Sequence, residues 1–132
     1  MKSKYKAMVL SCMDPRFQHL VHSFLKKKKL TGKYSAFTIA GAAVGVTHNK
    51  FKKWHNTFYD NLATSIQLHE IEKLIVINHK DCGAAKIVNG KKKFTSIIEN
   101  KIHKDSFKVI KKTLNKKFPN LKIYFKILSL KD

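Results

Sequence analysis

The chain has 132 residues, which suits a single domain over residues 1–132 with one hydrophobic core. Hydrophobic residues make up 43% of the chain, which excludes intrinsic disorder, and no apolar run is long enough to span a membrane. The 28 basic residues outnumber the 8 acidic ones, giving a formal net charge of +20 that does not by itself identify a partner.

The first half of the chain predicts two strands, each followed by a helix. A short apolar run at residues 6–11 is typical of a buried strand. A helix is expected from Pro15 to the lysines at 26–29, with Asp14 as its N-cap. A second strand at 34–40 leads into a loop of small residues at 41–45, whose backbone can approach a neighbouring group closely.

The second half continues the alternation. A helix is predicted at 54–70, and a continuous β-branched run at 73–78 predicts a strand buried on both faces. A short helix at 83–88, a long helix at 94–117 and a last strand at 121–130 follow. This order predicts an α/β fold with a central, mainly parallel sheet of about four strands flanked by helices.

Two short motifs contain both cysteines and the one arginine of the chain. They are Cys12-Met13-Asp14-Pro15-Arg16 and His79-Lys80-Asp81-Cys82-Gly83. Each motif follows a predicted strand, and sites in open α/β sheets form beyond the carboxyl ends of strands. We therefore expect the two motifs to build one site.

Cys12, His79 and Cys82 together are ligands that suit zinc or another divalent metal ion. Three protein ligands leave the fourth position open, which is typical of catalytic rather than structural zinc. A closed Cys2His2 site is an alternative, and two small buried cysteines without a metal are another. The further histidines, none of them at a finger-like spacing, are His19, His22, His48, His55, His69 and His103.

Asp14 and Arg16 lie beside the first cysteine. A guanidinium can hold a carboxylate through two hydrogen bonds, which lysine cannot do. One arginine in a chain rich in lysine therefore indicates a functional pair, in which Asp14 stays anionic and can accept a hydrogen bond from water on the metal. The alternatives are an ordinary surface ion pair and direct ligation of the metal by Asp14.

The pattern C-x-D-x-R followed by H-x-x-C-G resembles the signature of the β-class carbonic anhydrases, over roughly residues 6–87. The resemblance implies Zn²⁺ as cofactor, with Cys12, His79 and Cys82 as ligands and Asp14 and Arg16 as the catalytic pair. It further implies reversible hydration of CO2 to bicarbonate, and a homodimer or a higher homo-oligomer.

Three features depart from the family pattern. Residues 38–42 read Thr-Ile-Ala-Gly-Ala, where the family usually has R-N-A-G-N or R-N-A-G-G. Cys12 comes too early for the family's N-terminal helical arm, and Pro15 replaces a small residue. The expected pocket residues are Gly41, Ala42 and Gly83. Hydrolysis of carbonyl sulfide or carbon disulfide, and an inactive relative, remain alternative interpretations.

A different class of function is a basic nucleic-acid-binding protein with a structural zinc ion. Lysines occur along the whole chain, whereas arginine, the better partner for guanine edges and phosphates, is nearly absent. We therefore expect a small-molecule substrate and no specific nucleic acid. With no export signal and two cysteines expected to stay reduced, we expect a cytoplasmic protein without membrane insertion.

Overall fold

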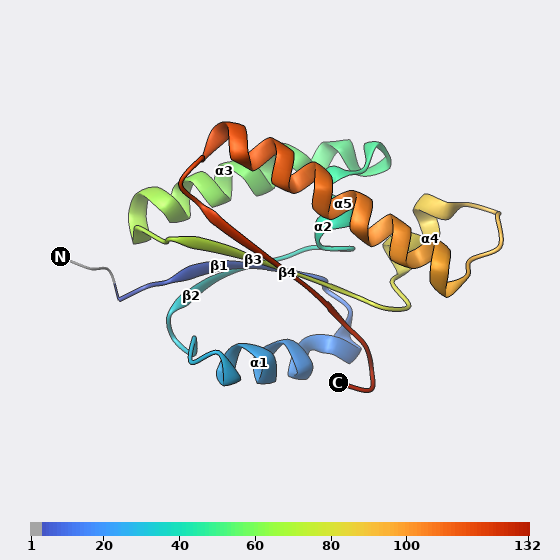
Figure 1. Ribbon diagram of the computed structural model, residues 1–132, viewed down its shortest axis with the longest axis horizontal. Coiled ribbons are helices and arrows are strands. Elements are labelled where there is room, and N and C mark those ends of the chain that lie inside the picture. Colours follow the sequence, from blue (N-terminus) through green and yellow to red (C-terminus); the bar gives the residue numbers. More distant parts are fainter. Residues whose placement is uncertain (1–3) are drawn as a thin grey trace.

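A parallel four-stranded sheet of order β2-β1-β3-β4 lies at the centre of the structure, a computed structural model that describes residues 4–132 (Figure 1). The strands are β1 (Ala7–Ser11), β2 (Tyr34–Thr38), β3 (Lys73–His79) and β4 (Lys122–Leu128). The central strands β1 and β3 are almost wholly buried, as their apolar sequences predict. The predicted α/β fold is confirmed.

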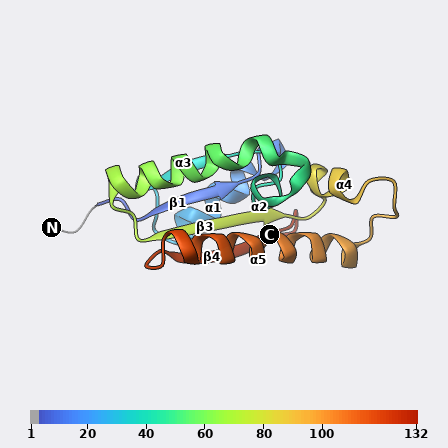
Figure 2. The same ribbon diagram turned by 90° about the horizontal axis from the view of Figure 1, so that it is seen from above.

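Helices cover both faces of the sheet. Helix α1 (Gln18–Lys27) packs on one face, and α3 (Lys52–His69) and α5 (Ser96–Lys117) lie side by side over the other (Figures 1 and 2). The shorter helices α2 (Ala43–Thr47) and α4 (Gly83–Asn89) lie toward the carboxyl ends of the strands. Within residues 4–132, none of the helices combines the length and the apolar character needed to cross a membrane.

The register of the sheet places the two motifs at the same edge. Ser11, the last residue of β1, is aligned with Ile77 of β3. Cys12 therefore leaves the sheet beside the carboxyl end of β3, where His79 is the last strand residue. The chain enters the next helical segment through a 3-10 turn, Pro15–Phe17, and the Asp14 side chain accepts from the Arg16 backbone N–H, as expected of an N-cap.

The predicted loop at 41–45 is only partly a loop. Gly41 and Ala42 have positive φ angles of 79° and 48°, but α2 begins at the next residue. The sequence of α2 has low intrinsic helix propensity, because valine and glycine are poor helix formers. Its Val44 and Val46 are buried in the main core, so tertiary packing stabilises a helix that the local sequence does not favour.

Gly45 packs against the backbone at the exit of β2. A Cβ atom there would overlap the carbonyl oxygen of Ala40, which cannot move without shifting the chain beside the site. We expect Gly45→Ala to lower the free energy of unfolding by about 1–3 kcal/mol, measured by urea denaturation. Gly83→Ala is the matched control, because its Cβ meets nothing within 4 Å, and its stability should equal or exceed that of the wild type. Equal stabilities of the two variants would contradict this expectation.

Candidate metal centre

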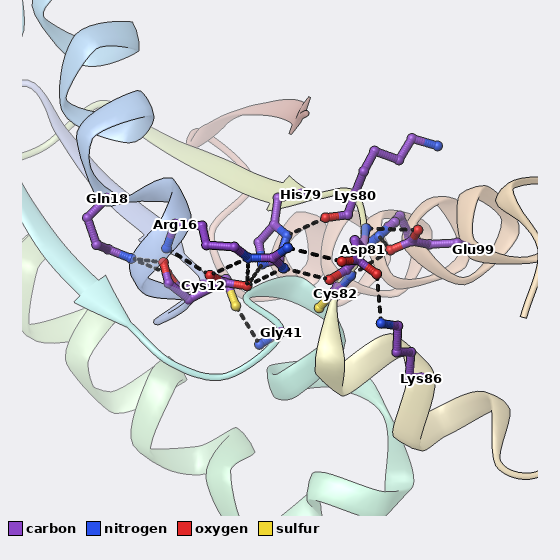
Figure 3. A network of polar contacts seen from close by, with 12 residues as sticks. Cys12, Arg16, Gln18, Gly41, His79, Lys80, Asp81, Cys82, Lys86 and Glu99 are labelled. Atoms are coloured by element: carbon purple, nitrogen blue, oxygen red, sulfur yellow. Dashed lines mark hydrogen bonds and ion pairs between the residues drawn. The ribbon is translucent and has the colours of Figure 1, made fainter. Parts of the chain in front are cut away.

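Three predicted ligand residues converge beyond the carboxyl ends of β1 and β3 (Figure 3). The Sγ atoms of Cys12 and Cys82 and a ring nitrogen of His79 all lie within 4.8 Å of one another, and all three residues are buried. Cys12 directly follows β1, His79 ends β3, and Cys82 is the N-cap of α4. In the part of the chain that the structure describes, no further histidine, cysteine or carboxylate joins this cluster.

The ring of His79 is oriented so that one of its nitrogens, Nε2, faces the cluster. Its Nδ1 lies 2.7 Å from the carbonyl oxygen of Lys80, and because a carbonyl only accepts, Nδ1 carries the proton. The other nitrogen, Nε2, is buried and finds no nitrogen or oxygen hydrogen-bond partner within residues 4–132. Burial alone would lower the pKa of His79, but its contact with Cys12 outweighs burial and raises the pKa. Phe17 stacks on the ring at a centroid distance of 4.0 Å and fixes its plane. A buried imidazole nitrogen beside two cysteine sulfurs fits a divalent metal ion.

The two cysteines differ in their readiness to ionise. A hydrogen bond from the Cys82 thiol is the main cause that lowers the pKa of Cys12 to about 4, against the opposing effect of burial. The backbone N–H of Gly41 also donates to the Cys12 sulfur, at 3.3 Å. The same sharing of one proton, together with burial, raises the pKa of Cys82. Cys12 is therefore the cysteine that ionises more readily, and the thiolate is the form that binds metals.

Arg16 holds Asp14 beside the cluster. Its Nη2 donates to Oδ2 of Asp14 at 2.8 Å, and its Nε lies 3.2 and 3.3 Å from the two carboxylate oxygens. These hydrogen bonds are the main cause that lowers the pKa of Asp14 to about 2, so the carboxylate is anionic at neutral pH. Oδ2 of Asp14 lies 3.8 Å from Nε2 of His79, which places the charge next to the ligand atoms.

Asp81 is a partner of Arg16 that the sequence analysis did not single out. Nη1 of Arg16 donates to Oδ2 of Asp81 at 3.0 Å, and Nη2 donates to its backbone oxygen at 3.1 Å. On its other side Asp81 binds Nζ of Lys86 at 2.7 Å (Figure 3). The guanidinium therefore connects the two motifs, through residues that are 65 positions apart in the sequence. The position of Asp81 inside the second motif was the one sequence feature that could have indicated its role at the site.

The three predicted pocket residues have different surroundings. Gly41 contacts the Cys12 sulfur, and a Cβ at Gly41 would come within 2.6 Å of the Cβ of Ala84. Ala42 is fully buried beside it. Gly83 is exposed at the start of α4. The structure therefore brings Gly41 and Ala42 against the cluster, while Gly83 adjoins it through Cys82 alone.

Glu99 of α5 is a second residue that the sequence analysis missed. Its carboxylate accepts hydrogen bonds from the backbone N–H groups of Asp81, at 3.0 Å, and of Cys82, at 2.9 Å (Figure 3). Burial alone would raise the pKa of Glu99, but these donors and His103 outweigh it and lower the pKa. In the sequence, Glu99 is one polar residue in a long amphipathic helix, and nothing local distinguishes it.

The sequence of the chain matches one protein family and two uncharacterized proteins. Residues 1–123 match a family described as "Putative carbonic anhydrase". Uncharacterized proteins of Rickettsia bellii (strain RML369-C) and Rickettsia conorii (strain ATCC VR-613 / Malish 7) are each 26% identical over 124 residues, 93% of this chain and 76% and 67% of theirs.

Among solved structures, the fold is similar to two carbonic anhydrases. The β-carbonic anhydrase CafA of Aspergillus fumigatus gives a TM-score of 0.67 at 10% identity, covering 98% of this chain and 73% of that one. The carbonic anhydrase from Glaciozyma antarctica gives a TM-score of 0.58 at 18% identity, covering 99% and 80%. At these identities the similarity establishes a shared fold.

Proposed function

The chain belongs to this carbonic anhydrase family, and on that premise we propose that it is a zinc-dependent enzyme that reversibly hydrates CO2 to bicarbonate. One observation carries the proposal. A ring nitrogen of His79 lies beside two buried cysteine sulfurs, with the anionic carboxylate of Asp14 only 3.8 Å from Nε2. A cluster that can bind a metal, with an oriented carboxylate beside it, is an arrangement suited to hydration chemistry.

Cys12, His79 and Cys82 are the residues that would hold the ion. When bound there, zinc supplies Lewis acidity that lowers the pKa of water toward neutrality. Asp14 accepts a hydrogen bond from the reacting water and orients it, and Arg16 keeps Asp14 anionic and correctly aimed. Gly41 and Ala42 form a close wall, and the net charge of +20 favours the approach of anions.

The position of Asp14 supports an active rather than a self-blocked site. Both of its oxygens accept hydrogen bonds from Arg16, which opposes rotation of the carboxylate onto the metal. Carbonyl sulfide and carbon disulfide are the alternative substrates, because they are small electrophiles like CO2. We also propose a homodimer, in line with the family resemblance of the two motifs.

The test begins with the metal. Purified protein should contain about one zinc per chain by plasma mass spectrometry, and stopped-flow assays should show CO2 hydration that is lost on chelation and restored by Zn²⁺. Zinc without CO2 hydration, but with hydrolysis of carbonyl sulfide or carbon disulfide, would favour the alternative substrates. Zinc with no such activity and salt-sensitive nucleic-acid binding would favour the structural alternative.

Arg16→Lys tests the geometry of the guanidinium. A lysine ammonium cannot bind both carboxylate oxygens of Asp14 and also bridge to Asp81, so Asp14 loses its orientation. We expect kcat/KM for CO2 hydration to fall at least ~10-fold with zinc content unchanged. Lys86→Gln is the control, because Lys86 contacts Asp81 but not Asp14, and it should keep activity within about twofold. Full activity of Arg16→Lys would contradict the role given to the guanidinium.

A further inference from the structure

A chain of buried hydrogen bonds connects the start of α2 to the turn that carries Cys82. The backbone N–H of Ala43 donates to Oδ1 of Asn78 at 3.0 Å. Nδ2 of Asn78 lies 2.8 Å from Nδ1 of His103, and Nε2 of His103 lies 3.1 Å from Oε2 of Glu99. That same oxygen accepts the N–H of Cys82 at 2.9 Å. The three residues whose side chains form this relay are at most 5% exposed.

The donors and acceptors of the relay follow a single direction. A backbone N–H only donates, so the Asn78 atom facing Ala43 is the oxygen, and the opposite atom is the NH2 group. An NH2 group also only donates, so Nδ1 of His103 is an acceptor and the ring proton sits on Nε2. That proton points at Glu99, whose two oxygens accept three hydrogen bonds, an arrangement that favours the ionised carboxylate. The orientation of Asn78 and the tautomer of His103 are thus fixed by their partners.

Glu99 is the one buried carboxylate among residues 4–132, and it lies directly behind a metal-ligand turn. A buried charge costs several kcal/mol unless hydrogen bonds compensate it. Here the compensating donors are His103 and the backbone N–H groups of Asp81 and Cys82. Asp81 has a φ of 58°, a strained angle for a residue with a side chain, so its turn needs external support.

We propose that Glu99 is a positioning residue for the metal centre, and that His103 and Asn78 orient it. By accepting both N–H groups of the turn, Glu99 sets the direction of the Cys82 sulfur and the location of Asp81, the second partner of Arg16. At its far end the relay fixes the first residue of α2, next to the wall formed by Gly41 and Ala42. This inference rests on the proposed function, because it assigns the relay to a metal site.

The test is metal affinity in Glu99→Gln, measured on the full chain after removal and return of the metal. Glutamine keeps the size of the side chain but presents one oxygen, so it cannot accept both N–H groups and the His103 proton. We expect the Kd for Zn²⁺, measured by competition with a chromogenic chelator, to rise about 10–100-fold. The visible absorption spectrum of the Co²⁺-loaded protein should also change, because the ligand geometry around the ion is altered.

Ser106→Ala is the matched control. The Ser106 hydroxyl donates to the backbone oxygen of His103 at 2.6 Å and accepts a long hydrogen bond from Nδ2 of Asn78 at 3.4 Å, but it does not touch Glu99. We expect this variant to lose stability while keeping the Zn²⁺ Kd within about twofold and the Co²⁺ spectrum of the wild type. A Glu99→Gln variant that behaves in the same way would overturn the proposal.

A measurement on the wild type tests the hydrogen-bond relay even if the Glu99→Gln variant does not fold. Nitrogen-15 NMR of the histidine rings should find His103 neutral with its proton on Nε2, whereas a proton on Nδ1 would overturn the relay. A wild type that binds neither Zn²⁺ nor Co²⁺ would overturn the proposed function itself, and the positioning role with it. Metal binding by the wild type combined with an unaffected Glu99→Gln variant would overturn only the positioning role.

Discussion

Cys82→Ser should purify with less than about one-tenth of the zinc of the wild type and lose CO2 hydration in proportion. Serine is nearly the same size as cysteine, but its hydroxyl stays protonated at neutral pH and is a poor zinc ligand. Even residues that only support a ligand cost 10–100-fold in metal affinity when they are changed, so loss of a ligand should cost more than ~100-fold. Measuring zinc content and the stopped-flow rate of CO2 hydration on the same sample would check the predicted loss of metal and the predicted loss of activity.

Met13→Ala is the matched control for this variant. Met13 follows a ligand directly in sequence, but its side chain is exposed and belongs to no contact of the cluster. Zinc content and activity should therefore match the wild type. Circular dichroism of Cys82→Ser should show a folded chain, because the substituted side chain fills nearly the same volume. Full zinc occupancy in a folded Cys82→Ser protein would exclude the cluster as the metal site.

Asp14→Asn should keep its zinc and lose about 10²–10⁴-fold in kcat/KM for CO2 hydration. The amide can neither accept a proton nor keep a negative charge beside the reacting water. It also loses the charge-assisted hydrogen bonds with Arg16 that orient the side chain. Zinc content should be unaffected, because Asp14 is not a member of the cluster of ligand atoms. Stopped-flow CO2 hydration over a range of pH would measure the loss.

The Asp81→Asn variant shows whether the loss in Asp14→Asn comes from the position of Asp14 or only from removing one negative charge near Arg16. Asp81 is the other carboxylate bound by Arg16, and its side chain is more exposed than that of Asp14. We expect this variant to lose less than ~10-fold in kcat/KM, since exposed ion pairs contribute little. Equal losses of kcat/KM in Asp14→Asn and Asp81→Asn would mean that the negative charge around Arg16 matters, rather than a specific role of Asp14. A gain of activity in Asp14→Asn would show instead that Asp14 competes for the metal.

The sequence predicted the sheet well because its strands have distinct local patterns. The run that forms β3 is β-branched and uninterrupted, and the observed strand extends the prediction by one residue, to His79. The topology then followed from the alternation of strands and helices. The convergence of Cys12, His79 and Cys82 was predictable for the same reason, because parallel strands present their carboxyl ends at one edge.

Residues that reach the site through tertiary contacts could not be predicted in this way. Glu99 and His103 lie in the first turns of α5, where their spacing is that of any helix, and only the packing of α5 behind Cys82 gives them a role. The contact of Asp81 with Arg16 depends on a left-handed turn that the sequence, lacking glycine there, does not indicate. Helix α2 was missed because burial, rather than propensity, stabilises it.

The placement of the ligands on two neighbouring central strands has a consequence for folding. Cys12 leaves β1 early in the chain, whereas His79 and Cys82 follow β3, so the site is complete only after these distant segments have paired. A metal bound there would join two segments that are distant in the sequence, and it could bind only after they have paired. Because the ion would bind the folded chain far better than the unfolded one, its binding free energy adds directly to the stability of the β1–β3 pair.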